Sequence, residues 1–262
     1  MQHLLQRLTW PEHLSEGEQN RLIESVSHIQ SFNPGDEIVP AHRPVDFSSI
    51  ILEGFSCRQK VLKTGSRQIT AFNLPGDFCD LHAYMLRTLP DSAVAITACR
   101  VAIVPHDELR EISTKLPRLT RLLWKSTLID ASIYRQWLVC IGRQSALSRL
   151  AHLFCELYLR LAVVGLAKEQ SFSLPLTQSD LSDAMGLSLV HTNRTCAALR
   201  QKGLATFAQR TVTIHSWEGL QQTAEFEPEY LHLGDTSANR ARPNPNSVRP
   251  ISKDIAARGG IR

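Results

Sequence analysis

Residues 176–203 constrain this chain more than any other stretch, because they predict two short helices joined by a tight turn. Thr177 can cap the first helix, and Asp180 three residues later completes a variant of the capping box. Gly186 can take a positive φ, as a sharp turn between helices requires. Ser188 can cap the second helix. This layout is typical of a helix-turn-helix, whose second helix fits the major groove of DNA.

The second helix of this hairpin is predicted to present two different faces. One stripe at helical spacing is expected to point inward and consists of Thr192, Cys196 and Leu199. On the other side, Arg194 can bond guanine and Asn193 can bond adenine, each through a pair of hydrogen bonds. Val190 offers an apolar contact, for instance to a thymine methyl group, and Leu189 lies beside it. We therefore predict that the base-reading residues are Leu189, Val190, Asn193 and Arg194.

Other polar residues of this region are expected to reach the DNA backbone. Three of them fall at helix starts, where contacts to phosphates set the register of a helix on DNA: Thr177, Gln178 and Ser188. Two β-prone runs at 205–207 and 211–214 predict a two-stranded wing, with Arg210 at its tip and able to touch phosphate. A helical hairpin inside any α-rich domain is the alternative. The wing favours double-stranded DNA as the partner.

The composition is that of a folded protein with a mildly basic balance of charge. The chain has 262 residues, of which 43% are hydrophobic, and this length supports one large domain or two small ones. Its net charge of +4 is compatible with nucleic acid. No apolar run reaches membrane-spanning length, and the start lacks the layout of a signal peptide. We therefore expect a cytoplasmic protein without a membrane partner, whose six cysteines are reduced and mostly buried.

Residues 1–106 predict a short helical lead-in followed by a β-rich domain. Turn signals recur at 33–36, 53–54, 64–66 and 74–77. The β-prone runs between and after them are 49–52, 57–62, 68–72 and 94–104. Short strands with regularly spaced turns indicate a sandwich or barrel of the jelly-roll type.

Residues 107–142 predict a long helix that is apolar on more than one side. Its main apolar seam is interrupted by Ser126 and Asp130 and consists of Leu119, Leu123, Ile133, Trp137 and Ile141. Such a helix must bury one face on its own domain and another on a partner, so we expect it to pair with a second copy in a homodimer. The alternative is a core helix buried within a single chain. Gly142 is expected to break the helix and to act as a hinge.

Two further regions complete the expected organisation. Residues 143–222 predict a helix from Arg143 to Val164 that leads into the winged helix-turn-helix. Residues 223–262 are expected to be a polar tail, and their last thirty or so carry Pro, Asn, Ser, Arg and Gly with almost no apolar pattern. We therefore predict that this tail has no fixed structure.

The order of these parts resembles the Crp/Fnr family of bacterial transcription regulators. The resemblance rests on Pro-Gly-Asp turns at 34–36 and 75–77, Leu-Glu-Gly at 52–54, Thr-Ala-Cys-Arg-Val-Ala at 97–102, and the hairpin at 176–203. It implies an α+β fold with an N-terminal jelly-roll β-barrel like a cyclic-nucleotide-binding domain, a long central dimerisation helix and a C-terminal winged helix-turn-helix.

The resemblance also implies a mode of action. A homodimer would bind a two-fold symmetric site whose halves lie roughly 34 Å apart. An effector in the barrel would shift the central helices and re-aim the two recognition helices. RNA polymerase would be a further partner if the protein is an activator. The family commonly has Glu at the position of Val190 and Ser or Gly at Asn193, whereas Arg194 matches, so the target sequence is expected to differ from the usual one.

Four residues are candidates for the effector pocket that the resemblance implies: Cys79, Asp80, His82 and Arg87. Cyclic-nucleotide-binding members carry a Glu just after a glycine and, about ten residues later, an Arg that neutralises the cyclic phosphate. Here Asp80 stands in place of the Glu, and the Arg position falls within residues 89–91, which are Leu, Pro and Asp. The phosphate would be left uncompensated, so we predict no tight binding of cyclic AMP.

Other cofactors of the family are not predicted either. Iron–sulfur members use a cysteine cluster near the N-terminus, whereas the first cysteine of this chain is Cys57. Haem-binding members ligate through Cys and His in the region of Cys79 and His82, but the spacing differs here. We predict no metal and no cofactor, and an effector of unknown identity.

Two other functions compete with a DNA-binding regulator. The first is a sensor or scaffold module whose hairpin contacts protein, which would show more exposed apolar residues than this hairpin does. The second is an enzyme with Cys79 as nucleophile, Asp80 as orienting group and His82 as base. No oxyanion or phosphate loop accompanies these three residues, so we predict that the protein is not an enzyme.

Overall fold

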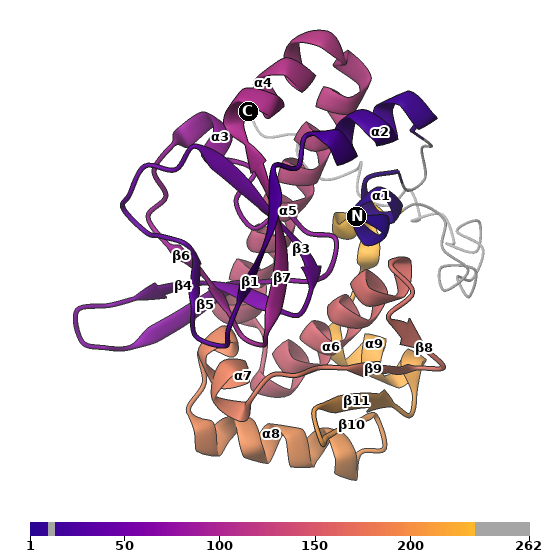
Figure 1. Cartoon of the computed structure of the whole chain (residues 1–262). Coiled ribbons are helices and arrows are strands. Elements are labelled where there is room, and N and C mark those ends of the chain that lie inside the picture. Colours follow the sequence, from indigo (N-terminus) through magenta and orange to yellow (C-terminus); the bar gives the residue numbers. More distant parts are fainter. Residues whose placement is uncertain (10–13, 234–262) are drawn as a thin grey trace, which may run out of the picture.

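The computed structural model describes residues 1–9 and 14–233, which form three parts in chain order (Figure 1). A β-rich part comes first, and the helices α1 (Gln2–Thr9) and α2 (Glu16–Glu24) precede its strands. A long helix, α5 (Pro117–Arg143), then runs along the molecule to a smaller part made of helices and a second, small sheet. Within the described residues, no helix combines the length and apolar character needed to cross a membrane.

Two antiparallel sheets pack face to face in the β-rich part. The strand order is β1-β7-β3 in one sheet and β2-β6-β4-β5 in the other. The strands are β1 (His28–Phe32), β2 (Glu37–Val39), β3 (Phe47–Glu53), β4 (Ser56–Val61), β5 (Arg67–Asn73), β6 (Ser92–Ala95) and β7 (Cys99–Pro105). Buried side chains from both sheets, such as Ile38, Ile51 and Val101, fill the space between them. The jelly-roll fold is confirmed, but the sheets are not joined into the closed barrel that we expected.

The strand boundaries differ from the predicted runs in two respects. The run 94–104 was expected to be one strand, but it forms β6 and β7, which belong to different sheets. The chain crosses between the sheets at residues 96–98, where Thr97 Oγ1 accepts a hydrogen bond from Phe55 N at 2.9 Å. In addition, β1 and β2 were not predicted. Most residues of β1 are exposed and show no alternation of apolar and polar side chains, and β2 has only three residues.

The helical middle of the chain is divided differently from the prediction. The expected helix over 107–142 consists of α4 (His106–Lys115) and α5, because Pro117 forces Leu116 out of the helical conformation. The expected break at Gly142 is displaced by one residue, since α5 ends at Arg143. The next helix, α6 (Ala146–Val163), begins at Ser145, whose hydroxyl caps it by accepting a hydrogen bond from Ser148 N at 3.2 Å.

The C-terminal part is a winged helix-turn-helix, as predicted. After α6 come α7 (Gln178–Met185), α8 (Leu189–Gln201), the wing strands β10 (Ala205–Ala208) and β11 (Thr211–Ile214), and α9 (Trp217–Ala224). Two strands that were not predicted, β8 (Ala167–Lys168) and β9 (Ser171–Ser173), extend the wing into a sheet of order β10-β11-β9-β8. The wing is therefore anchored to the segment that follows α6.

The unstructured tail was predicted to begin at residue 223, but the ordered structure continues beyond that residue. Phe226 and Leu231 are buried, and residues 228–231 form a 3-10 turn, η1 (Pro228–Leu231). Tyr230 stacks on His152 of α6, with 5.7 Å between ring centroids. The sequence signal was present in the three large apolar or aromatic residues of 226–231, which give the end of the chain something to bury. The rest of the predicted tail, 234–262, lies outside the described residues.

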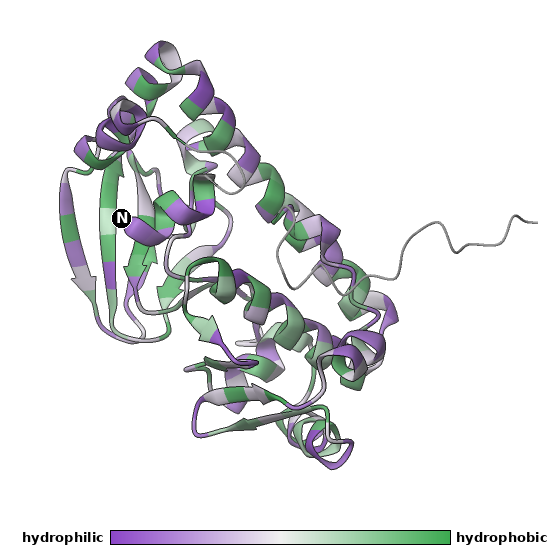
Figure 2. Cartoon of the chain, turned by 90° about the vertical axis from the view of Figure 1, so that its right-hand side faces the viewer, coloured by the Kyte–Doolittle hydropathy of each residue, from purple (hydrophilic) through white to green (hydrophobic). Residues whose placement is uncertain are grey.

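The expected dimer seam faces the interior of its own chain. Leu119 and Leu123 pack under the β-rich part, and Ile133 and Trp137 join the core next to α6, while Ile141 is half-buried. These side chains are turned inward because the β-rich part and α6 both cover that side of α5. The large apolar residues that α5 leaves exposed are Trp124, Leu128, Leu138 and Val139. Figure 2 shows apolar residues recurring along α5, which lies at the outer edge of the molecule.

Candidate nucleic-acid interface and sensor interior

The start of α7 has the capping chemistry that the sequence predicted. Asp180 N donates a hydrogen bond to Thr177 Oγ1 at 3.1 Å, and Asp180 Oδ2 accepts from Thr177 N at 2.8 Å. The Thr177 hydroxyl also donates to Asp180 Oδ2 at 2.6 Å. Gly186 ends α7 with φ 64°, a conformation that glycine adopts without strain. The turn between the two helices is therefore fixed by local sequence.

The second helix of the hairpin is held by its inner face. Ser188 caps α8 by accepting a hydrogen bond from His191 N at 3.3 Å. Thr192 and Leu199 are fully buried, as predicted, but Cys196 is half-buried and Thr195 takes the inner position instead. The hydroxyl of Ser182 on α7 donates to Thr192 Oγ1 at 2.9 Å. This bond inside the hairpin couples the orientation of α8 to that of α7.

The four expected base-reading residues all lie on the exposed side of α8. Leu189 and Val190, on its first turn, are 50% and 60% exposed. Asn193 and Arg194 are also exposed, one turn further along. The polar and apolar groups that could distinguish base pairs are thus presented together on one side of a helix at the outside of the molecule (Figure 1).

The same face of α8 borders a groove that the sequence did not reveal. The groove has a volume of about 600 Å³ and lies between α8 and the start of α6. Arg194 and Val190 line it together with His191, which is exposed on the first turn of α8. His191 was missed because sequence reasoning followed a single outward stripe, whereas an exposed helix turn presents side chains over a wider arc.

The residues expected at the DNA backbone surround this face. Gln178 and Ser188 are exposed at the starts of α7 and α8. Thr177 is also exposed, but its hydroxyl is already engaged by Asp180. Arg210 lies at the tip of the wing, where it and Gln209 take positive φ angles of 57° and 50° in the tight turn. The backbone carbonyl of Arg210 accepts from Leu174 N at 2.8 Å, which fixes the wing against the body of the domain.

Two family models match the chain, in the order of these two parts. The model described as a cyclic nucleotide-binding domain matches residues 29–115, and the model described as a Crp-like helix-turn-helix domain matches residues 148–223. The chain belongs to the Crp/Fnr family of transcription regulators. It is a DNA-binding transcription regulator, and the hairpin α7–α8 is the helix-turn-helix of this Crp/Fnr protein.

Curated relatives of this Crp/Fnr protein are named as transcription regulators, and the similarity covers most of their length. It is 24% identical over 213 residues to the transcriptional activator protein FnrL of Cereibacter sphaeroides, covering 80% of this chain and 85% of the relative. It is 26% identical over 199 residues to the transcriptional activator protein anr of Pseudomonas aeruginosa, covering 71% and 81%. The similarity extends across both parts of the fold, so it is not confined to the helix-turn-helix.

Solved structures of other family members share this fold. FixK2 from Bradyrhizobium japonicum superposes with a TM-score of 0.69 at 25% identity, covering 75% of this chain and 96% of that chain. CLP, a c-di-GMP responsive global regulator of Xanthomonas campestris, superposes with a TM-score of 0.62 at 13% identity, covering 77% and 100%. At 13% identity, the similarity to CLP shows a shared fold and nothing further.

Two of the expected effector-pocket residues of this Crp/Fnr protein are part of the core. Asp80 is fully buried, and its Oδ1 accepts a hydrogen bond from Ser49 N at 2.6 Å. Burial raises the pKa of the Asp80 carboxyl to about 7. Cys79 is buried with its Sγ 3.6 Å from Ser56 Oγ, and burial together with the charge of Asp80 raises the pKa of this thiol. Both features disfavour a reactive thiolate.

The third candidate, His82, contacts an arginine that sequence reasoning did not select. Arg58, on β4, is 5% exposed and donates from Nη1 to His82 Nε2 at 2.7 Å. Its Nη2 bonds Asp91 Oδ1 at 2.5 Å, and its side chain also hydrogen-bonds Tyr134 of α5. Burial and the charge of Arg58 lower the pKa of His82 to about 4, so the imidazole is neutral near pH 7. A buried arginine that is paired with Asp91 thus lies beside His82 in the β-rich part.

The fourth candidate lies elsewhere. Arg87 follows α3 (Ala83–Leu86) with φ 61° and is exposed. It lines a separate hollow of about 550 Å³ together with His106 and Arg110. The structure therefore does not bring the four candidates into one pocket. In the described part of the chain, no group of three or more His, Cys, Asp or Glu side chains is placed to hold a metal ion.

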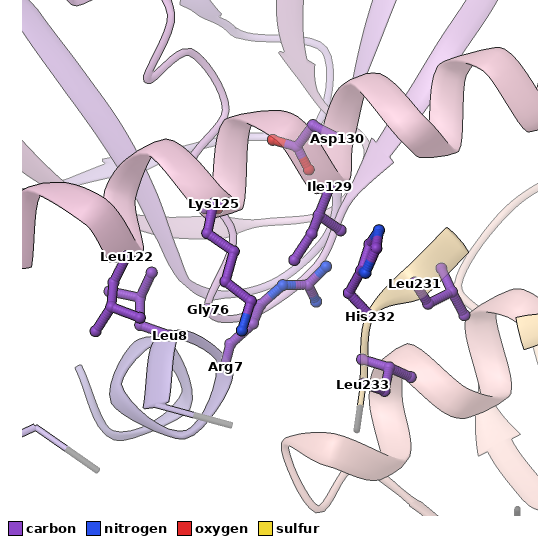
Figure 3. Close-up of a pocket in the computed structure, with 11 residues that line it drawn as sticks. Arg7, Leu8, Gly76, Leu122, Lys125, Ile129, Asp130, Leu231, His232 and Leu233 are labelled. Atoms are coloured by element: carbon purple, nitrogen blue, oxygen red, sulfur yellow. The ribbon is translucent and has the colours of Figure 1, made fainter. Parts of the chain in front are cut away.

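A buried network of charges joins the β-rich part to α6 of the C-terminal part. Asp77 accepts from Arg7 Nε of α1 at 2.6 Å and from Arg160 Nη2 of α6 at 2.9 Å. Arg160 also bonds Glu156 Oε1 at 3.0 Å. Figure 3 shows residues that line a small cavity beside this network, among them Arg7 and Asp130. Its volume of about 30 Å³ is that of roughly one water molecule, too small for an organic effector.

Proposed function

We propose that this regulator acts as a homodimer that binds a two-fold symmetric DNA site through its two α8 helices. The observation that carries the proposal is the spacing of α5 residues that are not buried in the chain. Five of these residues recur at intervals of four and three: Trp124, Leu128, Ala131, Arg135 and Leu138. Alternation of four and three is the pattern of a two-helix coiled coil, so a second copy of α5 fits this stripe.

Within each half-site, the exposed face of α8 supplies the base contacts. Arg194 is suited to guanine and Asn193 to adenine, and Val190 with Leu189 forms an apolar surface suited to a thymine methyl group. Since Val190 replaces the Glu that is common in the family, the cytosine contact that a carboxylate would make is absent from the proposed half-site. Half-sites would be separated by roughly 34 Å.

Contacts to phosphate are assigned to groups around that face. Gln178, Ser188 and Arg210 are exposed at helix starts and at the wing tip. His191 is added to them, because it lines the groove between α8 and the start of α6. Thr177 is expected to contribute less to phosphate binding, because its hydroxyl donates a hydrogen bond to Asp180. These contacts would set affinity and register, whereas the base contacts set the sequence.

We further propose that cyclic AMP does not bind tightly to the β-rich part. Asp91 is one of the three residues, 89–91, among which the position of the phosphate-binding arginine is expected, and it is paired with Arg58. A cyclic phosphate would have to displace this pair and would then face the charge of Asp91. A dissociation constant below one micromolar in titration calorimetry would contradict this proposal. An effector of other chemistry, and RNA polymerase as a partner, remain part of the proposal by analogy with relatives named as activators.

In-vitro selection of random DNA duplexes with the purified, ligand-free protein tests the proposed function. Enrichment of a two-fold symmetric motif is the expected result. Enrichment of an asymmetric motif would contradict the homodimer on a symmetric site. If a folded dimer enriches no sequence with or without cell-extract small molecules, the alternative of a scaffold whose hairpin contacts protein would be favoured.

A further inference from the structure

An ionic contact connects the β-rich part to the first helix of the helix-turn-helix. Arg67 begins β5, the second strand of the β4–β5 hairpin. Its Nη2 lies 2.6 Å from Asp180 Oδ1, and its Nε lies 2.6 Å from Asp183 Oδ2. Next to it, Gln68 Nε2 donates to the backbone carbonyl of Ala184 at 3.3 Å. One arginine thus binds two carboxylates that lie three residues apart on the same side of α7.

One of these carboxylates also determines where α7 begins. Asp180 uses Oδ2 to cap the helix, accepting from the backbone and the hydroxyl of Thr177, and uses Oδ1 to bind Arg67. The guanidinium therefore holds the same group that fixes the first turn of α7. Because α7 contacts both β5 and α8, a displacement of its first turn is transmitted to the recognition helix. The hydrogen bond from Ser182 to Thr192 is one route.

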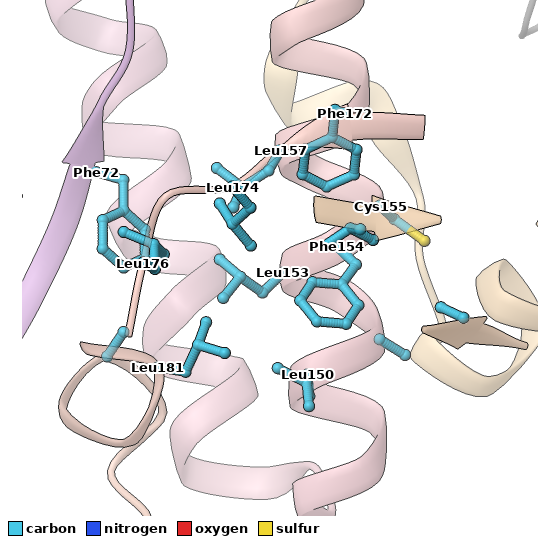
Figure 4. Close-up of a cluster of buried hydrophobic side chains, with 14 of the residues drawn as sticks. Phe72, Leu150, Leu153, Phe154, Cys155, Leu157, Phe172, Leu174, Leu176 and Leu181 are labelled. Carbon is cyan, nitrogen blue, oxygen red and sulfur yellow. The ribbon is translucent and has the colours of Figure 1, made fainter. Parts of the chain in front are cut away.

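Apolar packing around the contact holds the β-rich part and the helix-turn-helix together. Phe72 of β5 lies in the same buried cluster as Leu176 and Leu181 at the start of the helix-turn-helix, and as Leu150 and Leu153 of α6 (Figure 4). Arg149 of α6 adds a bond from Nη1 to the carbonyl of Met185 at 3.0 Å. Packing is non-directional, whereas the paired carboxylates accept only one orientation of the guanidinium. The ionic contact can thus select one orientation of α7 among those that the packing would tolerate.

We propose that Arg67 is a positioning residue for DNA binding, which holds α7 and hence α8 in the DNA-competent orientation from outside the helix-turn-helix. The base-reading face of α8 is exposed while this contact is closed, so the contact is compatible with bound DNA. The inference rests on the proposed function. Arg67 itself lies on β5, with α7 between it and α8 (Figure 1). Its effect on affinity would therefore be exerted through Asp180 and Asp183, without contact to DNA.

The test compares variants on the duplex that the wild-type protein selects. Arg67→Ala should weaken binding to that duplex by about tenfold and binding to a scrambled duplex by much less. Since Arg67 neutralises no phosphate, the slope of log affinity against log salt should equal that of the wild type. Arg210→Ala should instead reduce that slope. A smaller salt slope for Arg67→Ala, or tighter binding, would overturn the inference.

Two further variants separate positioning from a general loss of structure. Asp183→Asn removes one of the two carboxylate contacts of Arg67, so it should weaken binding, but less than Arg67→Ala does. The double variant should be no weaker than Arg67→Ala, because that substitution already removes both contacts. Arg67→Lys, which keeps the charge, should recover part of the affinity. Additive losses in the double variant would contradict the inference.

The control is Arg100→Ala, which breaks the exposed ion pair with Glu53, away from α7, and should leave affinity unchanged. Far-UV circular dichroism and sedimentation verify that each variant is a folded dimer. If wild type selects no duplex, the proposed function fails. If wild type selects one and Arg67→Ala binds it as well, the present inference alone fails.

Discussion

The indole Nε1 of Trp137 donates a hydrogen bond to Glu156 Oε2 at 2.9 Å, and this bond fastens the central helix to the first helix of the winged domain. Glu156 is fully buried, and it also accepts from Arg160 and from the hydroxyl of Tyr230, each at 3.0 Å. Trp137 therefore belongs to the junction between the parts of one chain. The partner of α5 in a dimer must be sought on the opposite side of the helix.

Removal of the carboxylate at this junction should be costly. Glu156→Ala leaves two arginines, Arg7 and Arg160, sharing the carboxylate of Asp77, so we expect a loss of about 3–5 kcal/mol in the free energy of unfolding. Urea unfolding followed by circular dichroism measures this loss. In the exposed Arg100–Glu53 pair, Glu53→Ala should cost less than about 1 kcal/mol. Equal losses in the two variants would show that Glu156 is not a network residue.

A single substitution on the exposed stripe of α5 should separate the two copies. Leu138→Asp places a charge in the proposed coiled-coil seam, so sedimentation at micromolar concentration should give a monomer with weakened affinity for the symmetric duplex. Leu62→Asp is the matched control, because Leu62 is similarly exposed but lies beyond β4. A Leu138→Asp protein that remains dimeric would place the dimer contact elsewhere.

Loss of the guanidinium on the recognition helix should affect sequence-specific binding first. Arg194→Ala removes a side chain that is exposed on α8, so the fold should be unchanged while binding to the selected duplex weakens by about 1–3 kcal/mol. Fluorescence anisotropy with selected and scrambled duplexes measures both affinities. Unchanged discrimination between the two duplexes would mean that the base-reading face was assigned wrongly.

The buried carboxyl of Asp80 should make stability depend on pH. Because burial raises its folded-state pKa to about 7, above the ordinary value of 3.8, the folded protein holds a proton there that the unfolded chain has released. The associated stability is therefore present at low pH and is lost as the pH rises toward 7. Asp80→Asn cannot titrate, so its stability relative to wild type should increase from pH 5 to 7 by up to about 1.4 kcal/mol per pH unit.

Urea titrations of both proteins at several pH values and one protein concentration test this expectation. Other titrating groups, including His82, are common to the two proteins and contribute equally. Above pH 8 the difference between the two should be constant. A difference that does not vary with pH would show that Asp80 is ionised throughout.

Local chemistry explains why the helix-turn-helix could be predicted from the sequence. The caps at Thr177 and Ser188 and the turn at Gly186 each depend on residues within four positions of one another. These caps and this turn therefore do not depend on contacts with distant parts of the chain. The wing followed for the same reason, since a tight turn between two β-prone runs specifies its own pairing.

Contacts between distant residues explain what could not be predicted. Large apolar residues stand both on the side of α5 that carries Leu119 and Trp137 and on the opposite side, so the sequence alone does not say which side the chain covers itself. Likewise, Arg58 has no local reason to be buried. It becomes a core residue because Asp91, thirty-three positions later, meets it across the sheet. Arg58 was not among the effector candidates for this reason, since it lies on another strand and reaches His82 only in the folded chain.

The buried pair of Arg58 and Asp91 also indicates how this protein could be brought under chemical control. Shortening Arg58 to alanine would leave a vacancy with the shape of a guanidinium group and with an acidic wall. Such a hole would admit small planar cations, such as methylguanidinium, and would repel nucleotides. A switch engineered into this chain in this way would respond to a cation.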